Sequence, residues 1–249
     1  MEPNKLKIAY CISGHIRTWK MALENQMANF IEPNDCDIFF YTSNIDTKKA
    51  RGNLKGRGKY DVVKNLDNDT LLTDIKTTYG DRLKKISIES EIEENNKKWQ
   101  SWEWIRNGQA KKIYECNKLL QTHDTKYDFI VRSRPDLKFT KKIYVEKYQH
   151  LHTNEELQNM VFAFGGWQNW GVKYVSDVFA IGVPKVMDIY SNLYEHVEKP
   201  YHGVFNLEYQ LGEHLKHNEI DVQWLNKDPG KKKPNMSWRD SNCFRIARK

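Results

Sequence analysis

The segment YDFIVRSRPDLKF, residues 127–139, joins an apolar run to a cluster of charged residues. Its pattern predicts a buried strand over residues 127–132, a turn over 133–136 and a short second strand over 137–139. A buried strand that ends in charged groups presents them at its carboxyl edge, which is where open α/β sheets bind ligands. The segment therefore indicates an α/β fold with a ligand site at the edge of its sheet.

Two arginines and an aspartate alternate along this segment. Arg132, Arg134 and Asp136 are spaced two positions apart, so their side chains point to one side of an extended chain. Guanidinium groups bind phosphate oxygens in a fork, and a hard divalent cation takes carboxylate oxygens, so the set suits a pyrophosphate with a metal ion. A structural Arg–Asp salt bridge at a strand end fits the motif equally well. The motif alone leaves both interpretations open.

The N-terminal sequence predicts a neighbouring part of the same sheet. KIAYCIS, residues 7–13, is a compact apolar run that ends at Gly14, and it predicts a buried first strand that passes into a turn. Residues 18–30 have helical spacing of their apolar positions, and residues 36–42 are a second strand-like run. Strand, helix and strand in this order imply a parallel pair.

The rest of the chain continues this alternation. Further strands are expected at 82–89, 161–164, 177–182 and 220–225, with Gly165 and Gly166 closing the second of them. Further helices are expected at 108–122, 184–197 and 208–217. The basic, glycine-rich residues 48–59 predict a mobile loop, and the tail from residue 226 predicts a turn and a weakly ordered end. These elements predict a mixed, mostly parallel sheet flanked by helices.

Composition limits the class of protein. The chain has 249 residues with a formal net charge of +7, and 39% of them are hydrophobic and 12% aromatic. This is enough to bury a core, and disordered chains lack such aromatic content. The basic pI, about 9.0, suggests an anionic partner such as nucleic acid, a membrane surface or the phosphates of a small substrate. Charge alone does not choose among these, and the dispersed lysines also fit a merely solvated surface.

Cysteine spacing and hydropathy predict a soluble, cytoplasmic protein. The four cysteines are far apart and form no CxxC pair, so we expect neither a zinc site nor a disulfide framework. The apolar run near the N-terminus is too short for a signal peptide, and no later stretch approaches the length of a membrane span. We therefore expect reduced thiols and no transmembrane segment.

The pattern YDfivRsRPDl.f after a helix resembles the metal-binding strand of GT-A glycosyltransferases, in particular glycan-assembly enzymes of bacteria and of large DNA viruses (chlorovirus-like). The resemblance implies a GT-A-like, Rossmann-like fold and, for a viral enzyme, a place in the host cytoplasm. It also implies transfer of a sugar from a UDP- or GDP-linked donor to a hydroxyl of a glycan or glycoprotein acceptor. In those families a DxD motif holds manganese or magnesium against the donor diphosphate. Here the motif reads Arg134-Pro135-Asp136, so Asp136 would be the metal ligand and the first aspartate is absent.

The same resemblance implies where the donor binds. SGHIRTW, residues 13–19, follows the first strand, where such enzymes contact the base and ribose, and its candidate donor residues are Gly14, His15, Arg17 and Thr18. Gly14 allows close approach of a ligand, and an ordinary turn is the plain alternative for this segment. The other donor candidates are the two strand arginines and two residues of the preceding helix: Arg132, Arg134, Gln109 and Lys112.

Two carboxylates are candidates for a catalytic base. FNLEYQLGEHL, residues 205–215, is similar to the ED..LG..L helix start of many GT-A enzymes, with Glu208 at the acidic position and Tyr209 in place of the partner aspartate. Asp177 follows the Gly- and Trp-rich stretch FGGWQNWG, which fits an acceptor loop. Either carboxylate suits deprotonation of an acceptor hydroxyl in an inverting displacement. The plain alternatives are a glutamate favoured by the helix dipole and a cap at a strand boundary.

The sequence thus predicts a single GT-A-like glycosyltransferase domain over residues 1–249. Its nucleotide-binding part is expected at about 5–140 and its acceptor-binding part at about 141–230. A basic nucleic-acid-binding protein is one alternative, supported by the charge and the KGRGK loop at 55–59. It ranks behind because the charges are dispersed, and we expect no nucleic-acid partner. A catalytically silent GT-A-like glycan binder is the other alternative, supported by the incomplete DxD motif.

Overall fold

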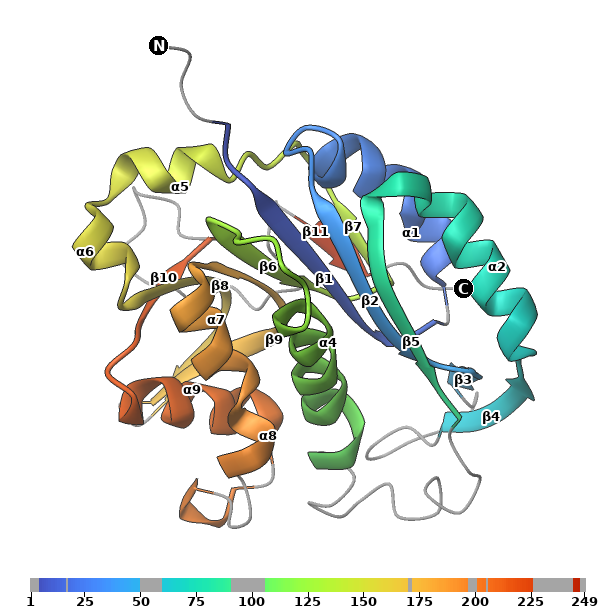
Figure 1. The fold of residues 1–249 in the computed structure, drawn as a ribbon. Helices are drawn as coiled ribbons and strands as arrows, with labels where there is room; N and C mark the ends of the chain where they lie inside the picture. Colours follow the sequence, from blue (N-terminus) through green and yellow to red (C-terminus); the bar gives the residue numbers. More distant parts are fainter. Residues whose placement is uncertain are drawn as a thin grey trace.

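The computed structural model describes residues 5–16, 18–49, 60–90, 106–169, 172–196, 201–204, 206–225 and 244–246. Its centre is a seven-stranded sheet with the strand order β10-β8-β9-β6-β1-β2-β5 (Figure 1). The strands of this sheet are β1 (Ile8–His15), β2 (Asp37–Ser43), β5 (Leu83–Glu89), β6 (Phe129–Ser133), β8 (Met160–Asn169), β9 (Val172–Gly182) and β10 (Asp221–Trp224).

Strand direction in the sheet is mostly parallel. β1 pairs in parallel with β2 and β6, β2 with β5, and β8 with β10. β9 is antiparallel to both of its neighbours, β6 and β8. The predicted α/β class with a mixed, mostly parallel sheet is therefore confirmed, and the arrangement is compatible with a Rossmann-like fold.

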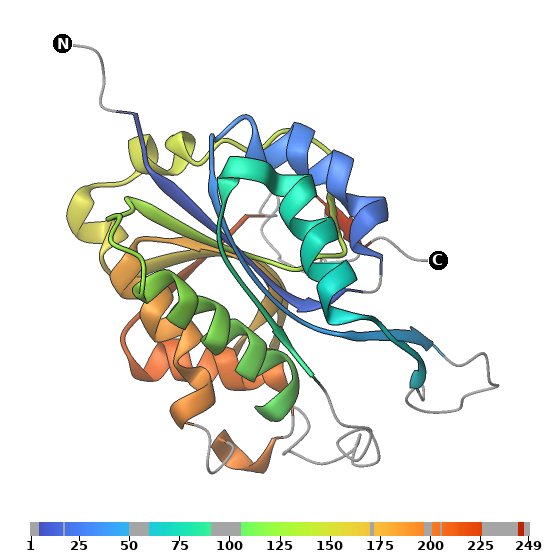
Figure 2. The ribbon, with the colours of Figure 1, turned by 45° about the vertical axis from the view of Figure 1, so that its right-hand side comes forward.

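Helices cover both faces of the sheet (Figures 1 and 2). One face carries α1 (Trp19–Gln26), its continuation η1 (Met27–Ile31) and α2 (Asn68–Tyr79), and the other carries α4 (Lys111–Gln121), α7 (Pro184–Ser191) and α9 (Leu207–His217). Shorter helical segments are η2 (Gly80–Arg82), η4 (Arg106–Ala110), α5 (Glu146–Leu151), α6 (Asn154–Leu157), α8 (Leu193–His196) and η5 (Tyr201–Gly203). No helix in the described ranges is long and apolar enough to cross a membrane.

Side-chain alternation in β1 joins the sheet to both helical layers. Tyr10 points to the α1 side, where its ring stacks on Phe30 at a centroid distance of 5.0 Å. Cys11 points to the α4 side and hydrogen-bonds Cys116, and this bond together with burial holds the pKa of the Cys11 thiol above its usual range. Residues of both faces are buried, which explains why the first strand reads as a continuous apolar run.

Two sequence predictions change at their boundaries, and one helix was not predicted. The expected loop at 48–59 begins inside β3 (Ile45–Lys49), which pairs antiparallel with β4 (Tyr60–Asn65), and residues 50–59 lie outside the described residues. Helix α2 follows β4 and was not predicted. The strand expected at 161–164 does not end at Gly165 and Gly166, since β8 continues through both. The register of its pairing with β9 is irregular there, and glycine inside a strand often marks such a bulge.

The C-terminal tail also differs from its prediction. β11 (Phe244–Ile246) pairs antiparallel with β7 (Leu137–Phe139), the short strand that follows the charged turn. The prediction of a weakly ordered end was therefore wrong for these residues. A segment of three residues is too short to form a stable strand alone, and β7 supplies its hydrogen-bond partners.

One buried histidine ties α9 to α7. The Nε2 of His214 donates to the carbonyl oxygen of Ile189 at 2.8 Å. Burial lowers the pKa of His214 to about 4; the bond to Ile189 opposes this shift, and the nearby His196 and His217 add to it. The folded protein therefore keeps this imidazole neutral where an unfolded chain would protonate it, since an unperturbed histidine titrates near 6.5.

The free energy of unfolding is expected to fall as the pH drops from about 6.5 to about 4, because over this range only the unfolded chain binds a proton at His214. Urea unfolding of the wild type and of His214→Gln at about pH 7 and about pH 4.5 checks this prediction. The stability advantage of the wild type should shrink by about 2–3 kcal/mol at the lower pH. An advantage that is the same at both pH values would contradict it.

Candidate functional site

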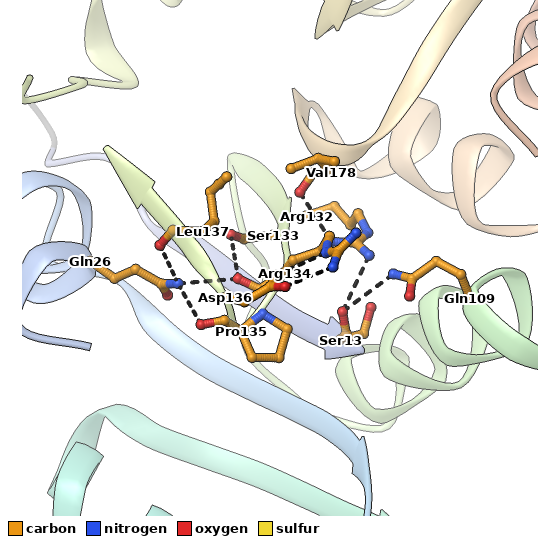
Figure 3. A network of polar contacts seen from close by, with 10 residues as sticks. All are labelled: Ser13, Gln26, Gln109, Arg132, Ser133, Arg134, Pro135, Asp136, Leu137 and Val178. Carbon is orange, nitrogen blue, oxygen red and sulfur yellow. Dashed lines mark hydrogen bonds and ion pairs between the residues drawn. The ribbon is translucent and has the colours of Figure 1, made fainter. Parts of the chain in front are cut away.

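The candidate site lies where the connections of the sheet change direction. β1 leads through α1 to β2 on one side, while β6, on the other side of β1, is entered through α4 from the opposite face. The carboxyl ends of β1 and β6 lie together, with Ile12 opposite Ser133 in the register. Such a topological switch point is the usual ligand site of open α/β sheets. The charged turn, which ends at Asp136, follows directly (Figure 3).

Gly14 holds the two strand ends close together. Its φ is +140°, a left-handed conformation that side chains rarely adopt, and a Cβ there would lie 3.2 Å from Cδ of Pro135 and 3.6 Å from Oε1 of Gln109. Thr42 donates its hydroxyl hydrogen to the Gly14 carbonyl oxygen at 2.7 Å. A glycine is therefore needed here, because any other residue would strain the backbone and would crowd Pro135 and Gln109.

Arg132 is buried, with 2% of its surface exposed. Its Nη1 donates to the carbonyl oxygen of Val178 and its Nη2 to that of Ser13, both at 3.2 Å. Within the described residues no carboxylate forms an ion pair with it, and its Nε has no hydrogen-bond partner. Burial lowers the pKa of Arg132, and electrostatic interactions with Tyr190 and Asp177 act in the opposite direction. Arg132 is thus a buried cation, and one of its own N–H donors is unsatisfied.

The Ser13 hydroxyl beside this arginine is unsatisfied as well. Ser13 is fully buried, and its Oγ has no hydrogen-bond partner. A buried polar atom without a partner costs about 1–3 kcal/mol, so native folds rarely leave one without a reason. Two such atoms, Ser13 Oγ and Arg132 Nε, lie at the carboxyl ends of adjacent strands. An anion that binds there would relieve both.

Arg134 and Asp136 form a bidentate salt bridge. Arg134 Nε donates to Oδ1 of Asp136 at 2.9 Å, and Nη2 donates to Oδ2 at 2.7 Å. The Arg134 charge also lowers the pKa of Arg132, which is the effect of a neighbouring cation (Figure 3). The structural salt bridge that the sequence left open is therefore present, and it uses both oxygens of the predicted metal ligand.

Gln26 of α1 holds the charged turn and was missed by the sequence analysis. Its Nε2 lies within hydrogen-bond distance of the carbonyl oxygens of Arg134 (3.1 Å), Pro135 (3.0 Å) and Leu137 (2.8 Å). Gln26 is buried on the same helix face as Trp19 and Phe30. The sequence did contain a signal for this role, because Gln26 lies among the apolar positions of the predicted helix. A buried amide needs hydrogen-bond partners.

The remaining donor candidates are distributed along the same edge. Gln109 Nε2 donates to the Ser13 carbonyl oxygen at 3.4 Å, which places its amide beside Gly14. His15 Nδ1 lies 3.1 Å from the Ser43 hydroxyl. Thr18 is buried at the start of α1, and Arg17 lies outside the described residues. Gln109 and His15 are therefore the members of this group that lie closest to Gly14 in the fold.

Lys112 has a different environment. It is buried and forms an ion pair with Glu89 at the carboxyl end of β5, where Lys111 also pairs with Glu89 at 3.0 Å. Burial alone would raise the pKa of Glu89, but the two lysines hold it below its usual range. The Tyr41 hydroxyl donates to the same carboxylate at 3.0 Å. β2 lies between this network and β1 in the sheet, so the structure does not bring Lys112 to Asp136.

A bulge in β9 carries Asp177. Ala163 of β8 lies opposite Ala180, whereas Gly165 lies opposite Val175. β8 therefore advances two residues while β9 advances five, and the additional residues leave the regular ladder. The carbonyl that Arg132 binds belongs to Val178, inside this bulge. Arg132 thus connects the end of β1 to the segment that carries Asp177.

The bulge turns Asp177 to the α7 and α9 side. Phe179 contacts Phe30 on the α1 side, and a regular strand would put Asp177, two residues earlier, on that same side. Instead Asp177 lines a pocket with residues of η4, α4, α7, α8 and α9: Ala110, Ile113, Tyr190, Ser191, Leu193, Leu207 and Leu211. Bulges often re-aim a side chain beside a site in this way.

The second candidate base is the sequence neighbour of a residue that lines this pocket. Glu208 follows Leu207 in the first turn of α9, whose N-cap Asn206 accepts a hydrogen bond from the Tyr209 backbone. Burial raises the pKa of Tyr190, Arg132 lowers it, and the charges of Asp177 and Glu208 both raise it further. The two carboxylates and Arg132 therefore all act on one buried phenol. No sequence pattern predicted that Tyr190 would lie near them.

Comparisons with known proteins add no identification. No protein-family model matches this chain, and no curated protein matches it. In the part of the chain that the structure describes, no group of three or more His, Cys, Asp or Glu side chains is arranged to hold a metal ion. What can be inferred about function therefore depends on the site itself.

Proposed function

We propose that this protein is a nucleotide-sugar-dependent glycosyltransferase of the GT-A type. Its donor, a UDP- or GDP-linked sugar, would bind with the diphosphate at the carboxyl ends of β1 and β6. The observation that carries the proposal is the pair of buried, unsatisfied donors at this switch point, Arg132 Nε and Ser13 Oγ. Neither atom has a hydrogen-bond acceptor in the fold. Phosphate oxygens are acceptors, and they also supply the negative charge that a buried arginine needs as a partner.

The surroundings of the pair support a nucleotide in particular. Gln109 and His15 present an amide and an imidazole at the same strand end, beside Gly14. Such groups can bind a base or a ribose, whereas the arginines suit the diphosphate. The basic net charge of +7 favours an anionic substrate. The acceptor would be a hydroxyl of a glycan or glycoprotein.

Transfer needs a base for the acceptor hydroxyl. In our proposal the Asp177 carboxylate accepts this proton as the hydroxyl oxygen forms a bond to the anomeric carbon. The bond from that carbon to the diphosphate breaks, and the nucleoside diphosphate leaves with the electron pair. This direct displacement inverts the anomeric configuration. Glu208, in the first turn of α9, is the competing candidate, and variants of the two residues distinguish them.

Donor binding is expected to depend on the Ser13 hydroxyl, although the fold does not. Calorimetric titration with UDP- and GDP-sugars should show that Ser13→Ala weakens binding about 10–100-fold, the loss of one hydrogen bond to a charged group. Urea unfolding of the same variant should show an equal or higher free energy of unfolding, because the Oγ that is lost has no partner in the fold. This combination separates a ligand contact from a structural one.

Other outcomes contradict parts of the proposal. If no nucleotide sugar binds to the wild type under any condition, the proposed function is wrong. Salt-sensitive binding of oligonucleotides in its place would favour a nucleic-acid-binding protein. Binding of a donor without transfer or hydrolysis would favour a catalytically silent glycan binder, for which the salt-bridged Asp136 provides an argument.

A further inference from the structure

The donor set around Asp136 does not fit the metal ion that the GT-A resemblance implies. Manganese and magnesium prefer about six oxygen ligands, usually including carboxylates. Asp136 is 3% exposed, and both of its oxygens already accept hydrogen bonds from Arg134. Among the described side chains, Asp136 belongs to no group of three or more His, Cys, Asp or Glu that could hold a metal ion.

Backbone oxygens do not complete such a site. Three carbonyls of the charged turn, those of Arg134, Pro135 and Leu137, face the amide of Gln26. This contact comes from α1, and it fixes the backbone on both sides of Asp136. The aspartate therefore has little freedom to turn away from its arginine toward a cation. A metal would have to displace Arg134 and would then gain a single carboxylate.

We propose that the Arg134–Asp136 pair takes the place of the metal. This inference rests on the proposed function. Asp136 acts as a positioning residue that fixes the Arg134 guanidinium, and Arg134 contacts the donor diphosphate. The Arg134 side chain is 22% exposed, so it is the member of the pair that reaches the surface. The donor accordingly binds without a divalent cation.

Physical reasons favour a held arginine over a mobile one. A guanidinium matches two phosphate oxygens in its plane, and it carries its charge at any pH the enzyme meets. The bidentate bond to Asp136 orders the long side chain before the donor arrives, which removes part of the entropy cost of binding. With Arg132 nearby, two fixed positive charges face the negative diphosphate, which is the role that a divalent cation plays in DxD enzymes.

Calorimetry with UDP- and GDP-sugars tests the inference in three buffers: with a chelator, with manganese and with magnesium. We expect the wild-type Kd to agree among them within about threefold, a difference well below one hydrogen bond to a charged group. Arg134→Gln should weaken binding about 10–100-fold in all three buffers. Arg134→Lys keeps the charge and loses the fork, so its affinity should fall between the two.

Asp136→Asn examines the positioning role. It removes the carboxylate charge that holds Arg134 but would also remove a metal ligand, so the two roles predict different patterns. As a positioning residue, Asp136→Asn weakens donor binding equally with chelator and with manganese. Where this variant does not fold, the pair Arg134→Gln and Arg134→Lys still tests the inference.

One result overturns the inference and leaves the proposed function standing. This is a donor that binds at least about tenfold more tightly with manganese than with chelator, a difference of about 1.4 kcal/mol, with Asp136→Asn removing that gain. Absence of donor binding in every buffer would instead refute the proposed function itself. The two failures are therefore distinguishable in a single set of titrations.

Discussion

Asp177→Asn is expected to lower the turnover of sugar transfer by a factor of about 10²–10⁴, which is the usual contribution of a general base. Asparagine has nearly the shape of aspartate and cannot accept the acceptor proton. The donor should bind the variant with nearly unchanged affinity, because Asp177 lines the pocket beside Tyr190 and not the turn that carries Arg134. The loss should therefore be in kcat, with little change in donor Kd.

Glu208→Gln is the matched control for this experiment. It removes a carboxylate that acts on the same Tyr190, but from the first turn of α9 rather than from the β9 bulge. A base is identified by the larger loss of kcat and by loss of the acidic limb of the pH–rate profile. A large loss in Glu208→Gln together with a small one in Asp177→Asn would contradict our assignment and make Glu208 the base.

The stereochemical outcome provides a second check. Direct displacement with Asp177 as base gives a product of inverted anomeric configuration. NMR of the product formed by the wild type measures that configuration. A retained configuration would overturn the displacement that we propose, whichever carboxylate is essential.

Phe30→Ala is expected to lower the free energy of unfolding by about 3–5 kcal/mol, the usual loss for a phenylalanine removed from a core. Phe30 is fully buried in η1 and joins three strands through its ring. Its centroid lies 5.0 Å from that of Tyr10 in β1, 5.3 Å from Phe139 in β7 and 5.4 Å from Phe179 in β9. Alanine would leave a cavity at the point where these strands meet.

Urea unfolding measures this loss, and Met21→Ala is a suitable control. Met21 is on the preceding helix α1 and is 44% exposed, so its replacement should change the free energy of unfolding by no more than about 0.5 kcal/mol. A loss below about 1 kcal/mol for Phe30→Ala would show that the aromatic cluster repacks. The same cluster supports β7 directly after Asp136, so donor affinity should also fall in Phe30→Ala.

Local patterns in the sequence were sufficient for the elements nearest the site. β1, β2 and β6 each contain a continuous run of apolar residues, because strands buried on both faces have no polar side. The apolar spacing of α1 and α4 was equally readable, and the strand–helix–strand order predicted that β1 and β2 are parallel. The position of the charged turn at a carboxyl edge followed from the same local information.

Other features depend on contacts between distant parts of the chain, and the local spacing of apolar residues does not predict such contacts. β9 is antiparallel and bulged, and only the bulge turns Asp177 away from the side of Phe179. β11 is a strand because β7 pairs with it. Lys112 was predicted to lie near the donor, and the structure pairs it with Glu89 at the end of β5. Short strands and buried charges take their roles from partners, and those partners are chosen when the sheet assembles.

The segment RSRPD shows both kinds of information together. The sequence by itself determined that two arginines and one aspartate end a buried strand and share one side. It left open whether Asp136 pairs with an arginine or holds a metal, because both uses need the same residue types. The tertiary structure forms the pair, since Gln26 from α1 fixes the turn and both oxygens of Asp136 face Arg134, and this geometry is the basis of our proposal that no metal binds there.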